Sequence, residues 1–237
     1  MELYKTDPEF MERVEHFTFD EVVNEEGQQM DKEDRYAAIL AVLIGCQGVD
    51  EYKRMLSKAL DDEISPVLIK EIVYQAVDYL GIGRVMSFLL ATNEVMQKRG
   101  IALPLAGQAT TTFENRLEKG IEVQTEIFGE RMKEAWKAGH VNRWLAANCF
   151  GDFYTRTGMK LAQREMITFC FLAAQGGCEP QLISHAIGNM RIGNDKDFLL
   201  KVVSQCLPYI GYPRSLNAIE CVNKAQKKFL EDESNGK

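Results

Sequence analysis

Residues 164–218 read REMITFCFLAAQGGCEPQLISHAIGNMRIGNDKDFLLKVVSQCLPYIGYPRSLNA, and residues 34–88 carry the same pattern. Both stretches begin near an arginine, pass through an apolar run to a glycine turn, and close on a second arginine. Arg35 thus answers to Arg164, and Arg84 answers to Arg214. An internal repeat of this length indicates two copies of one local fold.

The repeated pattern predicts helices at equivalent places in the two copies. The first pair is apolar almost all round, which is typical of helices buried in a core or interface. A glycine turn follows each of them. The helices of the first two pairs are expected over residues 33–46 and 162–175 and over residues 49–61 and 178–191. N-cap signals at Ser65-Pro66 and Asn194-Asp195 introduce a third pair, in which Pro208 predicts that the second copy kinks or ends early.

The rest of the chain also reads as helix. Residues 101–110 are the best loop candidate, and two further helices follow, broken near Gly129 and Gly139. The sequence therefore predicts an all-α fold in two parts. The first part, residues 1–110, is a repeat with an N-terminal helix and without reactive side chains. The second part, residues 111–237, holds the connecting helices and the repeat that carries the site.

Composition excludes several classes of protein. The chain has 237 residues, 46% hydrophobic and 27% charged, with a net charge of −7. This is an ordinary globular composition, and it lacks the basic surface expected of a protein that binds nucleic acid or an anionic membrane. No signal peptide or membrane span is visible, so a cytoplasmic protein with a small-molecule substrate is expected. Six cysteines without C-x-x-C spacing and three scattered histidines predict neither a disulfide framework nor a metal site.

The two copies differ at four reactive positions. The second copy has an acid, a thiol, an amide and an imidazole where the first copy has ordinary side chains. Because the first copy is expected to fold without these groups, they are candidates for function and not for scaffold. The aligned pairs are Tyr36 with Glu165, Val49 with Cys178, Tyr52 with Gln181, and Leu56 with His185.

Cys178 opens a helix directly after a glycine turn. The free N–H groups and the dipole of a helix start stabilise a thiolate, so a lowered pKa is expected, although a cysteine that only packs is the alternative. Gln181 and His185 follow on the same helical face. Seven residues rise about 10 Å along a helix, which favours a shared pocket wall or relay over a direct Cys178–His185 bond.

Glu165 lies on the helix before the glycine turn. If the two helices form an antiparallel hairpin, Glu165 comes within about one turn of His185. A carboxylate among apolar neighbours needs a partner, because an unpaired buried charge is unfavourable. A salt bridge with Arg164 or another arginine is the alternative, and the two are compatible.

Arginine and tyrosine side chains are candidates for binding substrate. Arg156 has no counterpart in the first copy and lies in a polar and aromatic cluster with Tyr154. Tyr209 and Arg214 flank the loop that Pro213 shapes, although the repetition of Arg214 by Arg84 favours a structural role. The expected catalytic residues are His185, Glu165 and Cys178, and the expected substrate-binding residues are Gln181, Arg156, Tyr209 and Arg214.

The second copy resembles the carboxymuconolactone decarboxylase family. The resemblance lies in its Arg-Glu opening, the GGCEPQ turn, the helical histidine and the YIGYPRSLNA ending. It implies an alkylhydroperoxidase D-like helical fold and assembly into rings of repeats. Two repeats in each chain would make such a ring a homotrimer.

The resemblance also implies one of two chemistries. In the decarboxylase branch a lactone that carries carboxylates loses carbon dioxide without a cofactor, so the protein binds anions and moves a proton. In the alkylhydroperoxidase branch a C-x-x-C-x-x-x-H motif reduces peroxides, but here Gln181 stands in place of the second cysteine. We therefore expect a decarboxylase-like enzyme, with a one-cysteine peroxidase using Cys178 second and a ligand-binding protein without turnover third.

Overall fold

The computed structural model describes residues 3–234, and within that range the chain forms helices and no strand. The all-α fold expected from the sequence is confirmed. Two of the helical segments, η1 and η3, are π-helical and η2 is a 3-10 helix. In chain order the elements are α1 (Leu3–Thr6), α2 (Pro8–His16), η1 (Phe17–Glu21), α3 (Val22–Asn24), α4 (Lys32–Gly45), α5 (Val49–Asp61), α6 (Pro66–Leu80), α7 (Ile82–Lys98), α8 (Arg116–Phe128), η2 (Glu130–Ala138), α9 (His140–Trp144), η3 (Leu145–Tyr154), α10 (Leu161–Gln175), α11 (Glu179–Arg191), α12 (Lys196–Ile210) and α13 (Tyr212–Ser234).

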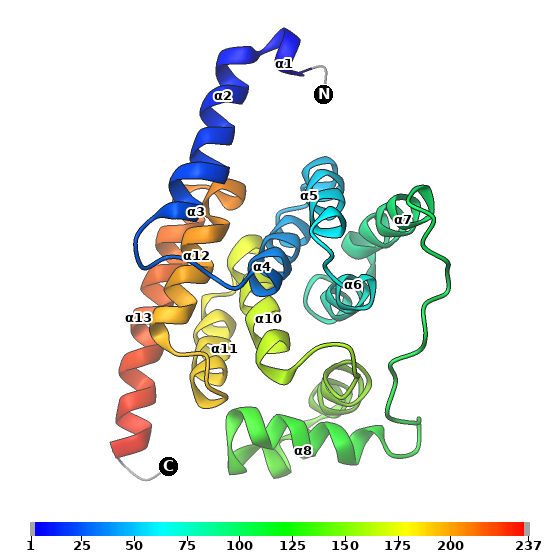
Figure 1. Ribbon diagram of the computed structural model, residues 1–237. Helices are drawn as coiled ribbons and strands as arrows, with labels where there is room; N and C mark the ends of the chain where they lie inside the picture. The colour runs from blue at the N-terminus through cyan, green and yellow to red at the C-terminus, as the bar shows by residue number, and fades with distance from the viewer. Residues whose placement is uncertain (1–2, 235–237) are drawn as a thin grey trace.

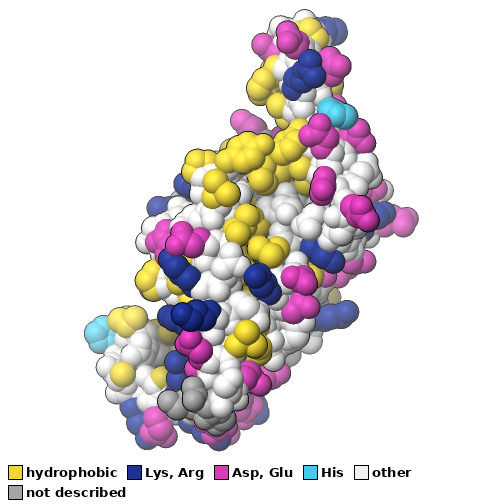
Figure 2. Space-filling model, turned by 90° about the vertical axis from the view of Figure 1, so that its left-hand side faces the viewer, with side chains coloured by type: hydrophobic (Ala, Val, Ile, Leu, Met, Phe, Trp, Pro, Cys, Tyr) yellow, Lys and Arg dark blue, Asp and Glu magenta, His cyan; other side chains and the backbone are white. Residues whose placement is uncertain are grey.

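The helices form one body from which the N-terminus projects. Helices α4 and α10 lie in the middle, with α5 to α7 on one side, α11 to α13 on the other and α8 at one end (Figure 1). Helices α1 and α2 project from this body but touch it, because Glu15 pairs with Arg54 of α5 at 3.4 Å and Met11 is buried. Figure 2 shows hydrophobic side chains gathered just below the projecting helices. Within residues 3–234 no helix has the length and apolar character that a membrane span requires.

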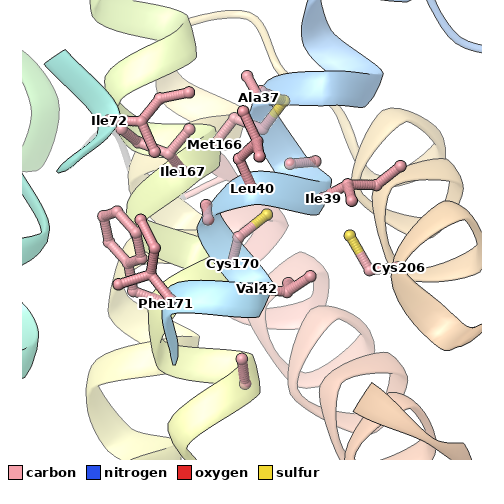
Figure 3. Close-up of a cluster of buried hydrophobic side chains, with 14 of the residues drawn as sticks. Ala37, Ile39, Leu40, Val42, Ile72, Met166, Ile167, Cys170, Phe171 and Cys206 are labelled. Carbon is pink, nitrogen blue, oxygen red and sulfur yellow. The ribbon is translucent and has the colours of Figure 1, made fainter. Parts of the chain in front are cut away.

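Helices α4 and α10 run parallel at the centre of the core. At one end Gln163 donates to the carboxylates of Glu33 and Asp34, at 2.8 and 2.9 Å. At the other end a Cβ on Gly45 would lie 2.7 Å from the Cβ of Ala174, so glycine permits the close approach. Figure 3 shows the apolar side chains of both helices meeting those of α6 and α12. Burial of these chains, at about 25 cal/mol per Å² of apolar surface, stabilises the fold.

Each central helix packs against the third helix of the opposite half. Arg35 on α4 donates to Oε1 of Gln205 on α12 at 2.7 Å, and Arg164 on α10 donates to Oε1 of Gln75 on α6 at 2.9 Å. These pairs occupy equivalent positions in the two copies of the sequence pattern. The equivalence of these two contacts supports the duplication, which stays a prediction, as does the division at residue 110. Residue 110 itself lies in the stretch of residues 99–115 that joins α7 to α8 without a helix.

The expected early end of the third helix in the second copy is wrong, whereas the alternative, a kink at Pro208, stays a prediction. Helix α12 continues to Ile210, so Pro208 does not shorten it. The reason is position, because Pro208 lies in the last turn. There it removes a single internal hydrogen bond, the one to the carbonyl of Ser204, and leaves the rest of the helix intact. The helix starts were anticipated more closely: the Asp195 side chain caps α12 by accepting from the Phe198 N–H at 2.8 Å.

Candidate functional site

The carboxylate of Glu165 on α10 and the imidazole of His185 on α11 form a buried pair. Nδ1 of His185 lies 2.9 Å from Oε2 and 3.2 Å from Oε1 of Glu165. The Glu165 side chain is fully buried, and that of His185 is 11% exposed. The contact expected across the α10–α11 hairpin is confirmed.

Local sequence explains how the two helices bring this pair together. Gly176 and Gly177 both have positive φ, 70° and 71°, and turn the chain between α10 and α11. A Cβ on Gly188 would lie 2.8 Å from Oε2 of Glu165, so this glycine makes room for the carboxylate. Asn189 then donates to the backbone carbonyl of Glu165 at 3.0 Å and ties the two helices side by side.

The second ring nitrogen of His185 faces outward. Because an ionised carboxylate can only accept, a neutral His185 donates through Nδ1–H and leaves Nε2 with a free lone pair. Within residues 3–234 Nε2 has no hydrogen-bond partner, and it is not among the buried atoms that lack one. The arrangement therefore offers one nitrogen that can accept a proton from, or return it to, a molecule at the surface of the site.

Two aromatic rings enclose the imidazole. Tyr79 from α6 and Phe128 from α8 stand nearly perpendicular to it, with ring centroids 5.5 and 5.3 Å away. Edge-to-face contacts of this kind favour a single ring orientation. The site thus draws on the first half, the connecting segment and the second half together.

Tyr154 contacts the Glu165–His185 pair, although the sequence indicated it only as a neighbour of Arg156 in a polar and aromatic cluster. Its hydroxyl donates to Oε1 of Glu165 at 2.6 Å and lies 2.7 Å from Oγ1 of Thr168 and 2.9 Å from the hydroxyl of Tyr79. Burial, and then the charge of Glu165, raises the pKa of Tyr154 well above its ordinary value. The tyrosine is therefore a neutral donor to the carboxylate. Neither Tyr79 nor Thr168 carried a signal in the sequence.

The buried arginine serves a different carboxylate. Arg164 donates to Glu71 at 3.0 Å and to Gln75 at 2.9 Å, so its charge does not pair with Glu165. Arg156, expected to bind substrate, also donates to Glu71, through Nε and Nη2. Burial lowers the pKa of Arg164, and the contact with Glu71 opposes this. Arg164 ties α10 to α6, and Arg156 ties the segment after η3 to α6 through the Nε and Nη2 edge of its guanidinium.

Cys178 is half-buried at the start of α11, and its expected activation is not seen. Burial raises the pKa of its thiol, which a hydrogen bond from Gln175 only partly opposes. The thiol lies 3.5 Å from the carbonyl of Leu172, a neighbour that disfavours a thiolate. The expectation of a lowered pKa is therefore wrong, because desolvation outweighs the helix start. Gln181 is exposed and makes no hydrogen bond within the described range.

Tyr209 and Arg214 lie with the first half and not beside His185. The Tyr209 hydroxyl lies 3.5 Å from Sδ of Met55, and the charge of Arg214 acts on Cys46. The equivalent residues of the first copy, Tyr79 and Arg84, lie near His185 and Cys178 instead. Tyr79 contacts His185, and Arg84 donates at 3.2 Å to Gln175, which in turn contacts Cys178. The reason is that α12, which carries Tyr209, packs against α4 of the first half, whereas α6, which carries Tyr79, packs against α10 of the second half.

An open cavity of about 380 Å³ adjoins the ring that covers His185. Phe128 lines it together with Arg131 and Arg191. Arg191 is engaged, because it donates to the Phe128 carbonyl and to Asp232. Arg131 is exposed, and no ion pair of its side chain is found within residues 3–234. The volume suits a small ligand. Arg131 offers it a cation, although the carboxylates of Glu130 and Asp232 also line the cavity.

Asp78, next to Tyr79, is a buried acid at the edge of the same cluster. Its Oδ2 is buried and has no hydrogen-bond partner among the described residues. Burial raises the pKa of Asp78 to about 8; the charge of Asp152 adds to the rise and the Cys149 thiol opposes it. The carboxyl group is consequently protonated in the folded protein at neutral pH.

The pKa of Asp78 predicts how stability depends on pH. Between about pH 4 and pH 8 the folded protein holds a proton that the unfolded chain releases, so its free energy of unfolding falls as pH rises. Asp78→Asn should remove this slope and make the protein more stable than wild type at pH 8, by a few kcal/mol. Urea unfolding at pH 5 and pH 8 measures the effect, with the exposed Asp197→Asn as control. An unchanged slope in Asp78→Asn would contradict the assignment.

Comparison with known proteins places this geometry in context. Residues 140–224 match the sequence model of the carboxymuconolactone decarboxylase family. The 4-carboxymuconolactone decarboxylase of Acinetobacter baylyi is 27% identical over 128 residues, which cover 48% of this chain and 89% of that protein. The matched family segment contains Tyr154, Glu165, Cys178 and His185, whereas Tyr79 lies before it.

Proposed function

Because this chain belongs to the carboxymuconolactone decarboxylase family, we propose that it is a decarboxylase-like lyase that needs no cofactor. Nε2 of His185 serves as the general acid or base, and Glu165 orients the ring. The observation that carries this proposal is the buried Glu165–Nδ1 contact, at 2.9 Å, with the opposite nitrogen free. A positioned histidine of this kind moves protons near neutral pH.

We assign the following steps to this arrangement. The bond between a ring carbon and a substrate carboxylate breaks, carbon dioxide leaves, and the electron pair passes into the conjugated carbonyl of the lactone. The imidazolium of His185 then delivers a proton to carbon, and solvent restores that proton at Nε2. Arg131 is the cation we assign to a second substrate carboxylate, in place of Arg156, whose guanidinium is held by Glu71.

The relative's name supplies the first substrate to test, 4-carboxymuconolactone. We expect the purified protein to release carbon dioxide from it or from a related lactone carboxylate. Treatment with a small hydroperoxide followed by intact mass measurement distinguishes the two alternatives, a one-cysteine peroxidase and a ligand-binding protein. Stoichiometric oxidation of Cys178, with turnover when a dithiol is added, would favour the peroxidase. A protein that changes neither the lactone nor the hydroperoxide would favour ligand binding without turnover.

The proposal includes a homotrimeric ring, for which two exposed apolar faces provide the support. Ile82, Met86 and Leu90 lie one helical turn apart along α7 and are 65%, 41% and 65% exposed. Tyr212 and Leu216, at the equivalent positions of α13, are 61% and 63% exposed. Faces of this kind on monomeric surfaces mark contacts with other chains. We assign the α7 face of one chain to the α13 face of the next.

Light scattering after gel filtration tests this assembly. We expect the mass of three chains of 26.9 kDa, and a fall to a single chain in Leu216→Glu. The control variant is Val141→Glu, because Val141 is also 63% exposed but lies on α9, away from both faces. A wild-type monomer at micromolar concentration would contradict the ring.

A further inference from the structure

A chain of buried hydroxyl and amide groups leads from the arginine pair to Glu165. Gln75 donates through Nε2 to Oγ1 of Thr168 at 2.9 Å, and Thr168 lies 2.7 Å from the Tyr154 hydroxyl. Tyr154 lies 2.6 Å from Oε1 of Glu165. Gln75, Thr168 and Glu165 are each at most 1% exposed, so water does not complete these contacts.

The direction of the hydrogen bonds from Gln75 to Glu165 follows from the contact between Arg164 and Gln75. Arg164 can only donate, and it does so to Oε1 of Gln75, so the amide presents its N–H group to Thr168. Thr168 accepts there and has its own hydrogen left for Tyr154. Tyr154, accepting from Thr168, is then left to donate to Glu165.

A second branch reaches the same hydroxyl. The Cys149 thiol lies 3.5 Å from the Tyr79 hydroxyl, and that hydroxyl lies 2.9 Å from the hydroxyl of Tyr154. A hydroxyl has one hydrogen to give and two lone pairs to accept with. Tyr154 can thus accept from both Thr168 and Tyr79 while it donates to Glu165, and every partner is satisfied.

We propose that Tyr154 is a positioning residue: supplied with hydrogen bonds by Thr168 and Tyr79, its hydroxyl holds Glu165 as a carboxylate and thereby selects the Nδ1–H form of His185. A protonated Glu165 would point a hydrogen at Tyr154 or at Nδ1. The first would require Tyr154 to turn its hydrogen from Glu165 to Tyr79, so that the short contact with Glu165 would be made by the proton of the acid. If the acid donated to Nδ1 instead, the single proton of the neutral imidazole would lie on Nε2, and Nε2 would no longer have a free lone pair. The role of Tyr154 in catalysis rests on the proposed function. The protonation states of Glu165 and His185 do not depend on that function.

The other groups around the pair are accounted for. Tyr79 and Asp78 face it from α6, Tyr154 and Cys149 from η3, and Arg164 from α10, where it is bound to Glu71. Helix α8 contributes Phe128, and α11 contributes the uncharged Asn189. No second cation approaches Glu165 among these groups, so the Tyr154 hydroxyl is the main donor besides His185.

Nitrogen-15 NMR of the histidine ring in the full-length protein, without substrate, tests the proposal. In wild type we expect neutral His185 to be protonated at Nδ1 and not at Nε2. In Tyr154→Phe the loss of a charge-assisted hydrogen bond should move protons onto the pair, so that its apparent pKa rises by about one pH unit and the Nε2–H form becomes populated.

Tyr52→Phe is the matched control. Tyr52 is fully buried and its hydroxyl lies 2.7 Å from that of Thr92, so removing it deletes an equivalent bond without touching the His185 chain. It should lower stability and leave the His185 resonances unchanged. If Tyr154→Phe does not fold, Thr168→Val and Tyr79→Phe are measured instead, each with a smaller shift in the same direction.

Two results would overturn the inference: wild-type His185 protonated at Nε2 when neutral, or a folded Tyr154→Phe whose tautomer and pKa match wild type. Failure of the proposed function looks different. In that case wild type would release no carbon dioxide, while the NMR result in the absence of substrate would stand.

Discussion

Replacing His185 by glutamine is expected to slow carbon dioxide release from 4-carboxymuconolactone, or from the lactone carboxylate that wild type accepts, by about 100-fold to 10,000-fold. Glutamine has a flexible side chain that can turn its amide N–H group toward Glu165, so the buried carboxylate keeps a donor and the fold should survive. It has no nitrogen that titrates near neutral pH. The loss should therefore appear in kcat, with KM little changed, because substrate contacts are retained.

Steady-state kinetics on His185→Gln and on Gln97→Ala would measure this effect. Gln97 lies on α7, is exposed and makes no side-chain hydrogen bond within residues 3–234, so its removal should change kcat by less than about threefold. Circular dichroism confirms that both variants are folded. A His185→Gln variant with nearly full activity would contradict the assigned role.

Gly120→Ala is expected to lower the free energy of unfolding by at least about 3 kcal/mol or to prevent folding. Helix α8 and the π-helix η3 cross so closely that a Cβ on Gly120 would lie 1.7 Å from the carbonyl oxygen of Ala146. From the other side, a Cβ on Gly151 would lie 2.1 Å from the carbonyl oxygen of Arg116. These neighbours are backbone atoms, so the crossing can only be relieved by moving a helix.

The same substitution should disturb the site. Helix α8 carries Phe128 against His185, and η3 carries Tyr154 against Glu165, so a shift of either helix loosens the pair. Urea unfolding measures the stability, and the control is Gly83→Ala, a helical glycine whose added Cβ would meet nothing within 4 Å. That variant should be neutral or stabilised by up to about 1 kcal/mol. Equal effects of the two substitutions would show that the crossing is less tight than the distances indicate.

The extent to which the sequence predicted the site can be seen from Glu165 and His185. Their pairing was predictable because both lie within one helical hairpin, whose turn is specified by two adjacent glycines with positive φ. Cys178 was harder. The helix start that favours a thiolate is visible in the sequence, but the burial that raises its pKa depends on how α11 packs against α10.

Tyr79 and Tyr209 show what the sequence could not predict, namely which of two equivalent tyrosines reaches His185. They are equivalent in the repeat, and the sequence offered Tyr209 for the site because it follows His185 in the same half. The structure brings Tyr79 to His185, because each central helix packs against the third helix of the other half. Contacts between residues far apart in sequence are set by the packing of whole helices, which local patterns do not encode.

The all-α fold, most helix boundaries, the family resemblance and the pairing across the α10–α11 hairpin could all be predicted from the sequence. Each of these depends on periodicity, on glycine and proline signals, or on contacts within one turn of chain. Three features became visible only in the folded protein: which tyrosine reaches the carboxylate, which acid Arg164 neutralises and in which direction the buried hydrogen bonds run. Those outcomes depend on desolvation and on the exchange of helices between the halves, and both arise only when the complete core is assembled.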